Sequence, residues 1–305
     1  MEPTSGHEQS AEGGAPKPAP RRSAVVPGLQ IQPFWVLVAG WSVLCGALAS
    51  HSAPWHGEAL LAFATAFLLV TVAWSGLWSM ATGSDWASLL QGERDRAPVH
   101  LPSLPYTRPG SPAGRMGRRM IRLVGWWRET FWPTAGSSAV MIFLSVALAV
   151  LLSILLPSRV RWLNLALVAP MALGMIQRRR SRAPLAAQAL LFVGLPWLAG
   201  YFPFSVFRWH ALLLSLFFSL SVWGVVRVAR GMVGGSWLLH GGQLSVAVML
   251  VILRQPLAAG GIVLLAFGTL LSWLTLRLGG DPPAVARRTW PWLLAAMLVA
   301  ALATP

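Results

Sequence analysis

The carboxylate side chains are the groups in this sequence best suited to bind a metal ion or to carry a proton. There are nine: Glu2, Glu8, Glu12, Glu58, Asp85, Glu93, Asp95, Glu129 and Asp281. None lies in the middle of an apolar run, where a charge costs roughly 2.5 to 3.5 kcal/mol to insert into a membrane and is kept for a function. A carrier coupled to protons or sodium usually has such a carboxylate, so the sequence disfavours that class and leaves a uniporter open.

Cysteine and histidine offer less metal chemistry than the carboxylates. The single cysteine, Cys45, excludes an internal disulfide framework and a zinc site built from cysteines. His210 and His240 stand near the ends of apolar runs, where a histidine can ligate a haem or a chlorophyll magnesium. The alternative is an interfacial histidine with its polar tip in water, and this is the interpretation that we favour.

A long polar stretch, Gly83 to Ser137, separates two apolar runs. It opens with Gly83-Ser84-Asp85-Trp86 and later reads Tyr106-Thr107-Arg108-Pro109-Gly110. Its last part, Met116 to Arg128, is basic and aromatic, with apolar residues at helical spacing. This last part predicts a helix that lies in the interface of a membrane.

This stretch resembles a loop of the UbiA-type membrane prenyltransferases, a family that includes the (bacterio)chlorophyll synthases. In that family the loop follows the second of nine spans, begins N-D-x-x-D-x-x-x-D and later carries an R-P-[IL]-x-x-G element. Ser84-Asp85-Trp86 and Arg108-Pro109 are similar to the two elements. A second loop after the sixth span normally supplies D-x-x-x-D, and Val226 to Gly242, which occupies its place, has no acidic residue.

The resemblance implies a prenyl diphosphate site in which carboxylates hold Mg²⁺ and basic residues draw charge from the leaving group. It implies catalytic roles for Asp85 and Arg108, and metal binding by Asp85, Glu93 and Asp95. Mg²⁺ would be the cofactor of an active enzyme.

The resemblance also implies that Arg94, Arg227 and Arg230 bind the anionic head of the substrate. The positions of the family's second and third aspartates hold Ser88 and Gly92, so the metal site is eroded. We therefore expect a protein that binds a prenylated lipid or prenyl diphosphate in a cytoplasm-facing cavity, with prenyl transfer as an activity to be tested.

The elements that must position these residues are membrane spans. The chain has 305 residues, of which 55% are hydrophobic and 11% charged, and its mean hydropathy is +0.61. That leaves too little polar surface to cover a soluble globule. We predict an all-α, polytopic transmembrane bundle of about nine spans: Ile31–Ser50, Glu58–Thr82, Ser138–Pro157, Trp162–Gln177, Pro184–Phe204, His210–Val228, Gly242–Leu253, Pro256–Leu276 and Trp290–Ala303.

The charges predict how this bundle is oriented, because loops that are translocated to the outer side of the membrane contain few Lys and Arg residues. With nine spans and a cytoplasmic N-terminus, all but four of the 24 Lys and Arg residues lie on the cytoplasmic side. The four are Arg159, Arg161, Arg208 and Arg254. The C-terminus is then outside, and the net charge of +15 reflects topology rather than a nucleic-acid partner.

Several residue types are expected to stabilise the bundle. Tryptophans near span ends are predicted to be interface anchors: Trp35, Trp162, Trp209, Trp237, Trp290 and Trp292. Polar residues in or beside spans are predicted to be interhelical hydrogen-bond donors: Asn164, Gln188, Gln243 and Gln255.

The predicted organisation is a disordered cytoplasmic tail, residues 1–30, and a transmembrane domain, residues 31–305, with a long cytoplasmic loop at 83–137. We expect a multi-pass protein of a bacterial inner membrane, in contact with membrane lipids. Two other functions stay open. One is a non-catalytic subunit or assembly factor of a membrane complex containing pigment or quinone, and the other is a small-solute permease.

Overall fold

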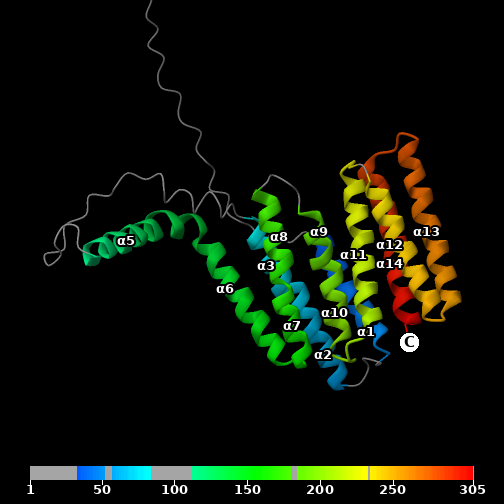
Figure 1. Ribbon diagram of the computed structural model, residues 1–305, viewed down its shortest axis with the longest axis horizontal. Coiled ribbons are helices and arrows are strands. Elements are labelled where there is room, and N and C mark those ends of the chain that lie inside the picture. The colour runs from blue at the N-terminus through cyan, green and yellow to red at the C-terminus, as the bar shows by residue number, and fades with distance from the viewer. Residues whose placement is uncertain (1–32, 52–56, 84–111, 180–183, 233, 305) are drawn as a thin grey trace, which may run out of the picture.

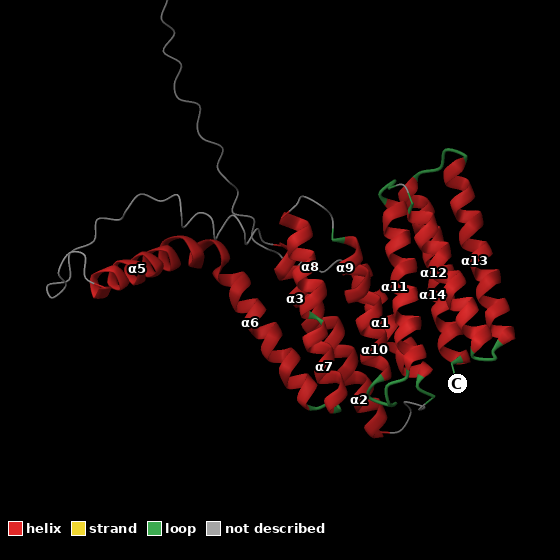
Figure 2. Ribbon diagram, viewed as in Figure 1, coloured by secondary structure: helices red, strands yellow, loops and turns green. Residues whose placement is uncertain are grey.

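The computed structural model describes residues 33–51, 57–83, 112–179, 184–232 and 234–304. Nearly all of them are helical, and the described residues contain no strand (Figure 2). The predicted tail, residues 1–30, lies outside the described residues, as does much of the predicted loop. The all-α fold class is confirmed.

The first half of the chain forms helices on either side of the predicted loop (Figure 1). The elements are α1 (Pro33–Ala49), α2 (Gly57–Leu68), a π-helical turn η1 (Leu69–Trp74), α3 (Ser75–Gly83), α5 (Pro112–Trp126), a π-helical turn η2 (Trp127–Phe131), α6 (Trp132–Ile154), α7 (Ser158–Ala166) and α8 (Val168–Arg179).

The second half is an almost unbroken series of apolar helices. They are α9 (Leu185–Ala189), a π-helical turn η3 (Leu190–Gly194), α10 (Leu195–Tyr201), α11 (Trp209–Ala229), α12 (Gly235–Ile252), α13 (Pro256–Arg277) and α14 (Pro282–Ala303).

Six helical stretches among the described residues are long and apolar enough to cross a membrane. They are Gly57–Gly83, Trp132–Ile154, Ser158–Gln177, Trp209–Ala229, Gly235–Ile252 and Pro256–Arg277. Pro33–Ala49 and Leu185–Tyr201 are shorter apolar helices. The chain is therefore a multi-pass helical membrane protein, and the count of nine spans stays a prediction.

Three helices begin earlier than their apolar runs predict. α6 begins at Trp132 instead of Ser138, α12 at Gly235 instead of Gly242, and α14 at Pro282 instead of Trp290. Proline in the first turn of α6 and α14 has its φ already set for a helix, so these small or polar first turns are helical rather than loop.

The second predicted loop is also mostly helical. Of Val226 to Gly242, only residues 230–234 connect α11 to α12. Gly231 and Gly234 have φ values of +65° and +82°, a conformation that glycine adopts without strain and that allows this short turn.

Successive helices run up and down the bundle, so alternate connections meet at the same end (Figure 1). The α11–α12 and α13–α14 connections lie at the end where α6 begins, which groups Arg227, Arg230 and Arg277 at that end. Arg208 and Arg254 precede helices that begin at the other end. This asymmetry supports the predicted topology, while the side of the membrane that each end faces stays a prediction.

Glycines allow α1 and α10 to touch through their backbones. A Cβ added at Gly46 would lie 1.9 Å from the carbonyl oxygen of Trp197, and one added at Gly200 would lie 2.0 Å from that of Val43. Small residues permit such contacts in membrane proteins, where the burial of apolar surface away from water does not drive helix association. Gly224 and Gly242 play the same part between α11 and α12.

The tryptophans divide into two groups, and the prediction that all six are interface anchors is wrong for two of them. Trp35 and Trp290 are only 8% and 9% exposed, and their rings meet edge to face with centroids 5.9 Å apart. They join α1 to α14 in the core. Trp162, Trp209, Trp237 and Trp292 are exposed, in agreement with an interfacial position.

Candidate functional site

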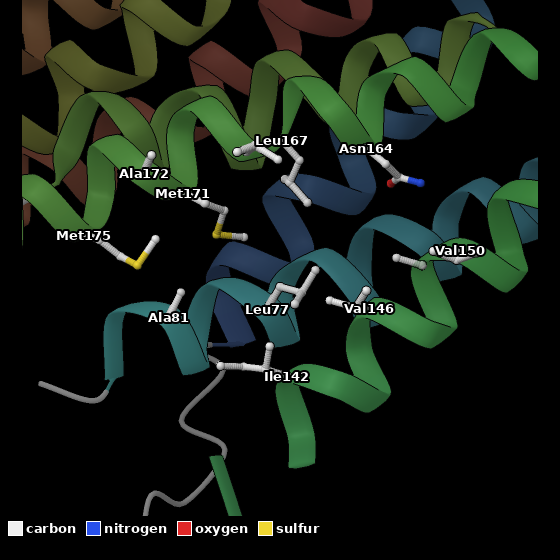
Figure 3. A pocket seen from close by; sticks show the side chains of 12 residues that line it. Leu77, Ala81, Ile142, Val146, Val150, Asn164, Leu167, Met171, Ala172 and Met175 are labelled. Atoms are coloured by element: carbon white, nitrogen blue, oxygen red, sulfur yellow. The ribbon is translucent and has the colours of Figure 1, made fainter. Parts of the chain in front are cut away.

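A groove of about 470 Å³ lies between α3, α6, α7 and α8 (Figure 3). Leu77 and Ala81 reach it from α3, Ile142 from α6, and Met171 and Met175 from α8. Every described lining residue is apolar except Asn164 of α7. An apolar concavity of this size with one polar group has the usual character of a small-molecule site.

The groove is not enclosed. Val146 and Val150 of α6, Val168 and Met175 of α8 line it and are also exposed on the outer surface. From Asn164 to Met175 it extends roughly 16 Å at the helical rise of about 1.5 Å per residue. That length is about half of a hydrocarbon core of about 30 Å. A groove of this length with an apolar lining has room for a stretch of hydrocarbon chain.

Close contacts with glycines set the width of the groove. A Cβ at Gly174 of α8 would lie 2.7 Å from the ring of Trp78, and one at Gly76 of α3 would lie 3.0 Å from Oγ of Ser145. α3 is thus held close to α8 on one side and to α6 on the other. Trp78 is buried and closes the space between α3 and α8.

Asn164 joins three elements at one end of the groove. The indole Nε1 of Trp74, in η1, donates to its Oδ1 at 2.9 Å, and its Nδ2 donates to Oγ of Ser153 in α6. Because an indole N–H is only a donor, Oδ1 must face Trp74. An asparagine amide has two N–H groups and two oxygen lone pairs, so these two bonds leave one of each for a further partner. The interhelical role predicted for Asn164 is confirmed.

Gln243 makes an interhelical hydrogen bond as an acceptor and not as the predicted donor. Its Oε1 accepts a hydrogen bond from Oγ1 of Thr269 at 2.9 Å, which links α12 to α13. Its Nε2 is buried and has no hydrogen-bond partner among the described residues. No groove residue takes part, so this pair belongs to the packing of α12 against α13.

Most of the residues predicted to form the diphosphate site lie outside the described residues: Asp85, Glu93, Arg94, Asp95 and Arg108. Their roles and the Mg²⁺ cofactor stay predictions. Among the residues that the structure describes, no three His, Cys, Asp or Glu side chains come together as a metal site.

The two remaining predicted substrate-binding residues are not in the groove. Arg227 lies in the last turn of α11, with its guanidinium 5.9 Å from the ring centroid of Trp223, and Arg230 follows that helix. The groove is lined by α3, α6, α7 and α8 instead. The structure therefore does not bring these arginines to the groove, and their binding role stays a prediction.

The histidines are more buried than the sequence suggests. Nδ1 of His240 lies 2.8 Å from the carbonyl oxygen of Ser236, and Nε2 of both His210 and His240 is buried. His210 is only 5% exposed. The prediction of interfacial histidines with a polar tip in water is thus wrong, and neither lines the groove.

The groove itself was not foreseen, although the sequence holds a trace of it. Asn164, Leu167, Met171 and Met175 recur at intervals of three and four, which places them on one face of a helical stretch. Methionine is flexible and fills irregular space, so two on one face suit a site with a flexible occupant.

Fold and groove together define a multi-pass α-helical membrane protein with an apolar groove between its helices. No protein-family model, curated protein sequence or solved structure matches the chain. The likeness to UbiA-type prenyltransferases therefore still rests on Ser84-Asp85-Trp86 and Arg108-Pro109, together with the predicted topology.

Proposed function

We propose that this protein is a UbiA-like membrane protein that holds the hydrocarbon chain of a prenylated lipid in the groove between α3, α6, α7 and α8. The observation that carries the proposal is the groove, which is apolar, not enclosed and roughly as long as half the hydrocarbon core. The groove accepts a long hydrocarbon chain, and the isoprenoid follows from the resemblance in the stretch after α3.

The polar head of the lipid belongs at the arginine-rich end of the bundle. Ala81 and Met175 line the groove near this end, where α3 finishes at Gly83. Chain continuity puts Asp85 two residues beyond Gly83. In this proposal the head is therefore near the predicted first motif, and the predicted bacterial inner membrane supplies the lipid.

Prenyl transfer is the further step of the proposal. Asp85, Glu93 and Asp95 would hold Mg²⁺, whose chemistry is to neutralise the diphosphate as it leaves. Arg108 would draw charge from the same leaving group. Two of the family's aspartate positions hold Ser88 and Gly92, so the protein can bind the lipid without holding the metal that transfer needs. Binding and transfer therefore have separate tests.

Mass spectrometry of lipids that remain on the gently purified protein tests binding. We expect a bound isoprenoid, and we expect Ala172→Phe, which fills the groove, to remove most of it. Ala147→Phe is the matched control, because Ala147 is exposed on α6 and is not a lining residue. Equal isoprenoid on both variants, or none on the parent protein, would refute the binding site. A stoichiometric protein partner in place of lipid would favour the membrane-subunit alternative.

Release of diphosphate from added prenyl diphosphate and Mg²⁺ tests the leaving-group step of transfer, with water taking the prenyl group in the absence of an acceptor. Magnesium-dependent release that is lost in Asp85→Ala and Arg108→Ala would support an enzyme. A bound isoprenoid without release would leave a lipid-binding relative of the family and would remove the transfer step.

A further inference from the structure

α5 stands apart from the rest of the protein. It extends sideways from the start of α6, away from the other helices (Figure 1). Large apolar side chains on it are exposed, among them Met116 at 67% and Val124 at 61%. No described part of the chain packs over these side chains.

The side chains of α5 divide into an apolar face and a basic face. At about 100° per residue, Met116, Met120, Leu123 and Val124 fall within an arc of about 100°. Arg115, Arg119 and Arg122 share a separate arc of about 60° beside it. The sequence of α5 contains no acidic residue. A helix of this kind suits an environment that offers both an apolar phase and negative charge.

The junction with α6 places α5 at the level of the membrane surface. In η2, the rings of Trp127 and Phe131 stack with centroids 4.4 Å apart, and Trp126 lies 5.2 Å from Phe131. Such aromatic clusters occupy the boundary between hydrocarbon and water. α6, which is apolar enough to span the membrane, begins at the next residue, Trp132.

We propose that α5 lies flat on the membrane, with its apolar face in the leaflet and its arginines bound to anionic phospholipid head groups. The occupant of the exposed face is the lipid surface next to α6. At that surface hydrocarbon and charged head groups are adjacent, so one helix can contact hydrocarbon with its apolar face and head groups with its basic face. Each arginine near an anionic surface strengthens such binding about fivefold. This inference does not depend on what the groove binds.

Labelling the full chain in nanodiscs tests the proposal. An environment-sensitive fluorophore is attached at Val124→Cys, on the apolar face, or at Gly125→Cys, about 100° further round the helix. A side chain at Gly125 meets no described atom within 4 Å, and the native Cys45 is buried and does not compete for the label. The reconstituted protein is compared in phosphatidylcholine alone and with phosphatidylglycerol added.

We expect the label at position 124 to be shielded from acrylamide, a neutral quencher that an anionic surface does not repel, and the label at 125 to remain accessible. We expect shielding at 124 to rise at least tenfold with phosphatidylglycerol, to weaken in high salt, and to lose this lipid dependence when Arg115, Arg119 and Arg122 are all changed to Gln. Monodisperse elution with unchanged helix content confirms that this variant folds.

Three results would overturn the proposal. Equal accessibility at 124 and 125 in every lipid would show that α5 does not lie on the bilayer. Shielding at 124 that ignores phosphatidylglycerol and the arginines would remove the anionic-lipid partner. Shielding that appears in detergent and depends on protein concentration would assign the apolar face to another protein chain.

Discussion

We expect Gly46→Ala to destabilise the protein, because Gly46 lies where the backbones of α1 and α10 touch. A Cβ at Gly46 would lie 1.9 Å from the carbonyl oxygen of Trp197, whereas real Cβ contacts are essentially never shorter than 3.0 Å. The difference, 3.0 minus 1.9, means that Gly46→Ala must separate the two backbones by at least 1.1 Å at this point. Since both groups belong to helix backbones, no side-chain rotation can relieve the contact.

The expected cost follows from the neighbours that must move. Val43 and Trp197 are fully buried and Tyr201 nearly so, and a gap of about 1 Å loses up to about half of each contact across the crossing. Overpacking of a core costs about 1 to 3 kcal/mol, and a backbone contact belongs at the upper end. Alanine recovers about 1 kcal/mol in helix propensity over glycine. We therefore expect Gly46→Ala to lower the free energy of unfolding by about 2 kcal/mol.

Unfolding in mixed micelles of dodecyl maltoside and SDS, followed by tryptophan fluorescence, measures this change. Gly241→Ala is the matched control, because Gly241 lies within α12 and an added Cβ there meets no described atom within 4 Å. We expect the control to be as stable as the parent or slightly more so. A Gly46→Ala protein within about 0.5 kcal/mol of the parent, the usual range of a neutral surface change, would refute the reasoning.

Gly200→Ala provides an internal check, since its Cβ would lie 2.0 Å from the carbonyl oxygen of Val43 at the same crossing. One separation of the helices relieves both contacts. The double variant should therefore lose about as much stability as either single variant, and the departure from additivity should be about 2 kcal/mol. Additive losses would mean that the two contacts are relieved independently.

Other positions give further expectations for the same unfolding measurement. Asn164→Leu should cost about 1 to 3 kcal/mol, because the buried indole that donates to it loses its acceptor. Thr269→Val should cost about 1 kcal/mol, whereas Gln243→Met should be neutral or stabilising, because it removes a buried amide nitrogen that has no described partner. Trp290 is 9% exposed and Trp237 is 84% exposed. Trp290→Ala should therefore lower the free energy of unfolding by about 3 to 5 kcal/mol, and Trp237→Ala by less than about 0.5 kcal/mol. Equal losses would contradict the division of the tryptophans into buried and exposed groups.

Hydropathy predicted where helices lie, because a long apolar run has few alternatives to a helix in lipid. It did not predict where α6, α12 and α14 begin, because their first turns are small, polar or basic and resemble loops. The burial of Trp35 and Trp290 was also missed. A tryptophan at a span end faces lipid or a neighbouring helix, and only the packing of α1 against α14 decides which.

The candidate site was less predictable than the fold. Asn164 was recognised as an interhelical residue, yet its partners in η1 and α6 are distant in sequence. The groove arises because the distances between its four helices differ. Glycines such as Gly174 allow some of these helices to come closer than others, through contacts between residues that are far apart in the sequence. The motif stretch that suggested the function lies outside the described residues.

The π-helical turn η1 has a consequence for the span in which it lies. A π turn closes hydrogen bonds one residue further along than an α turn, so each one adds a residue to the helix. Every side chain after η1 is thereby offset by about 100° around the axis and about 1.5 Å along it. Leu77 and Ala81, which line the groove from α3, follow η1 directly. A helical wheel drawn unbroken from Gly57 to Gly83 therefore assigns them to the wrong face. Deleting a single residue of η1 would convert the π turn to an α turn and leave Leu77 and Ala81 facing the groove, whereas deleting a residue between η1 and Leu77 would turn them away from Met171 and Met175.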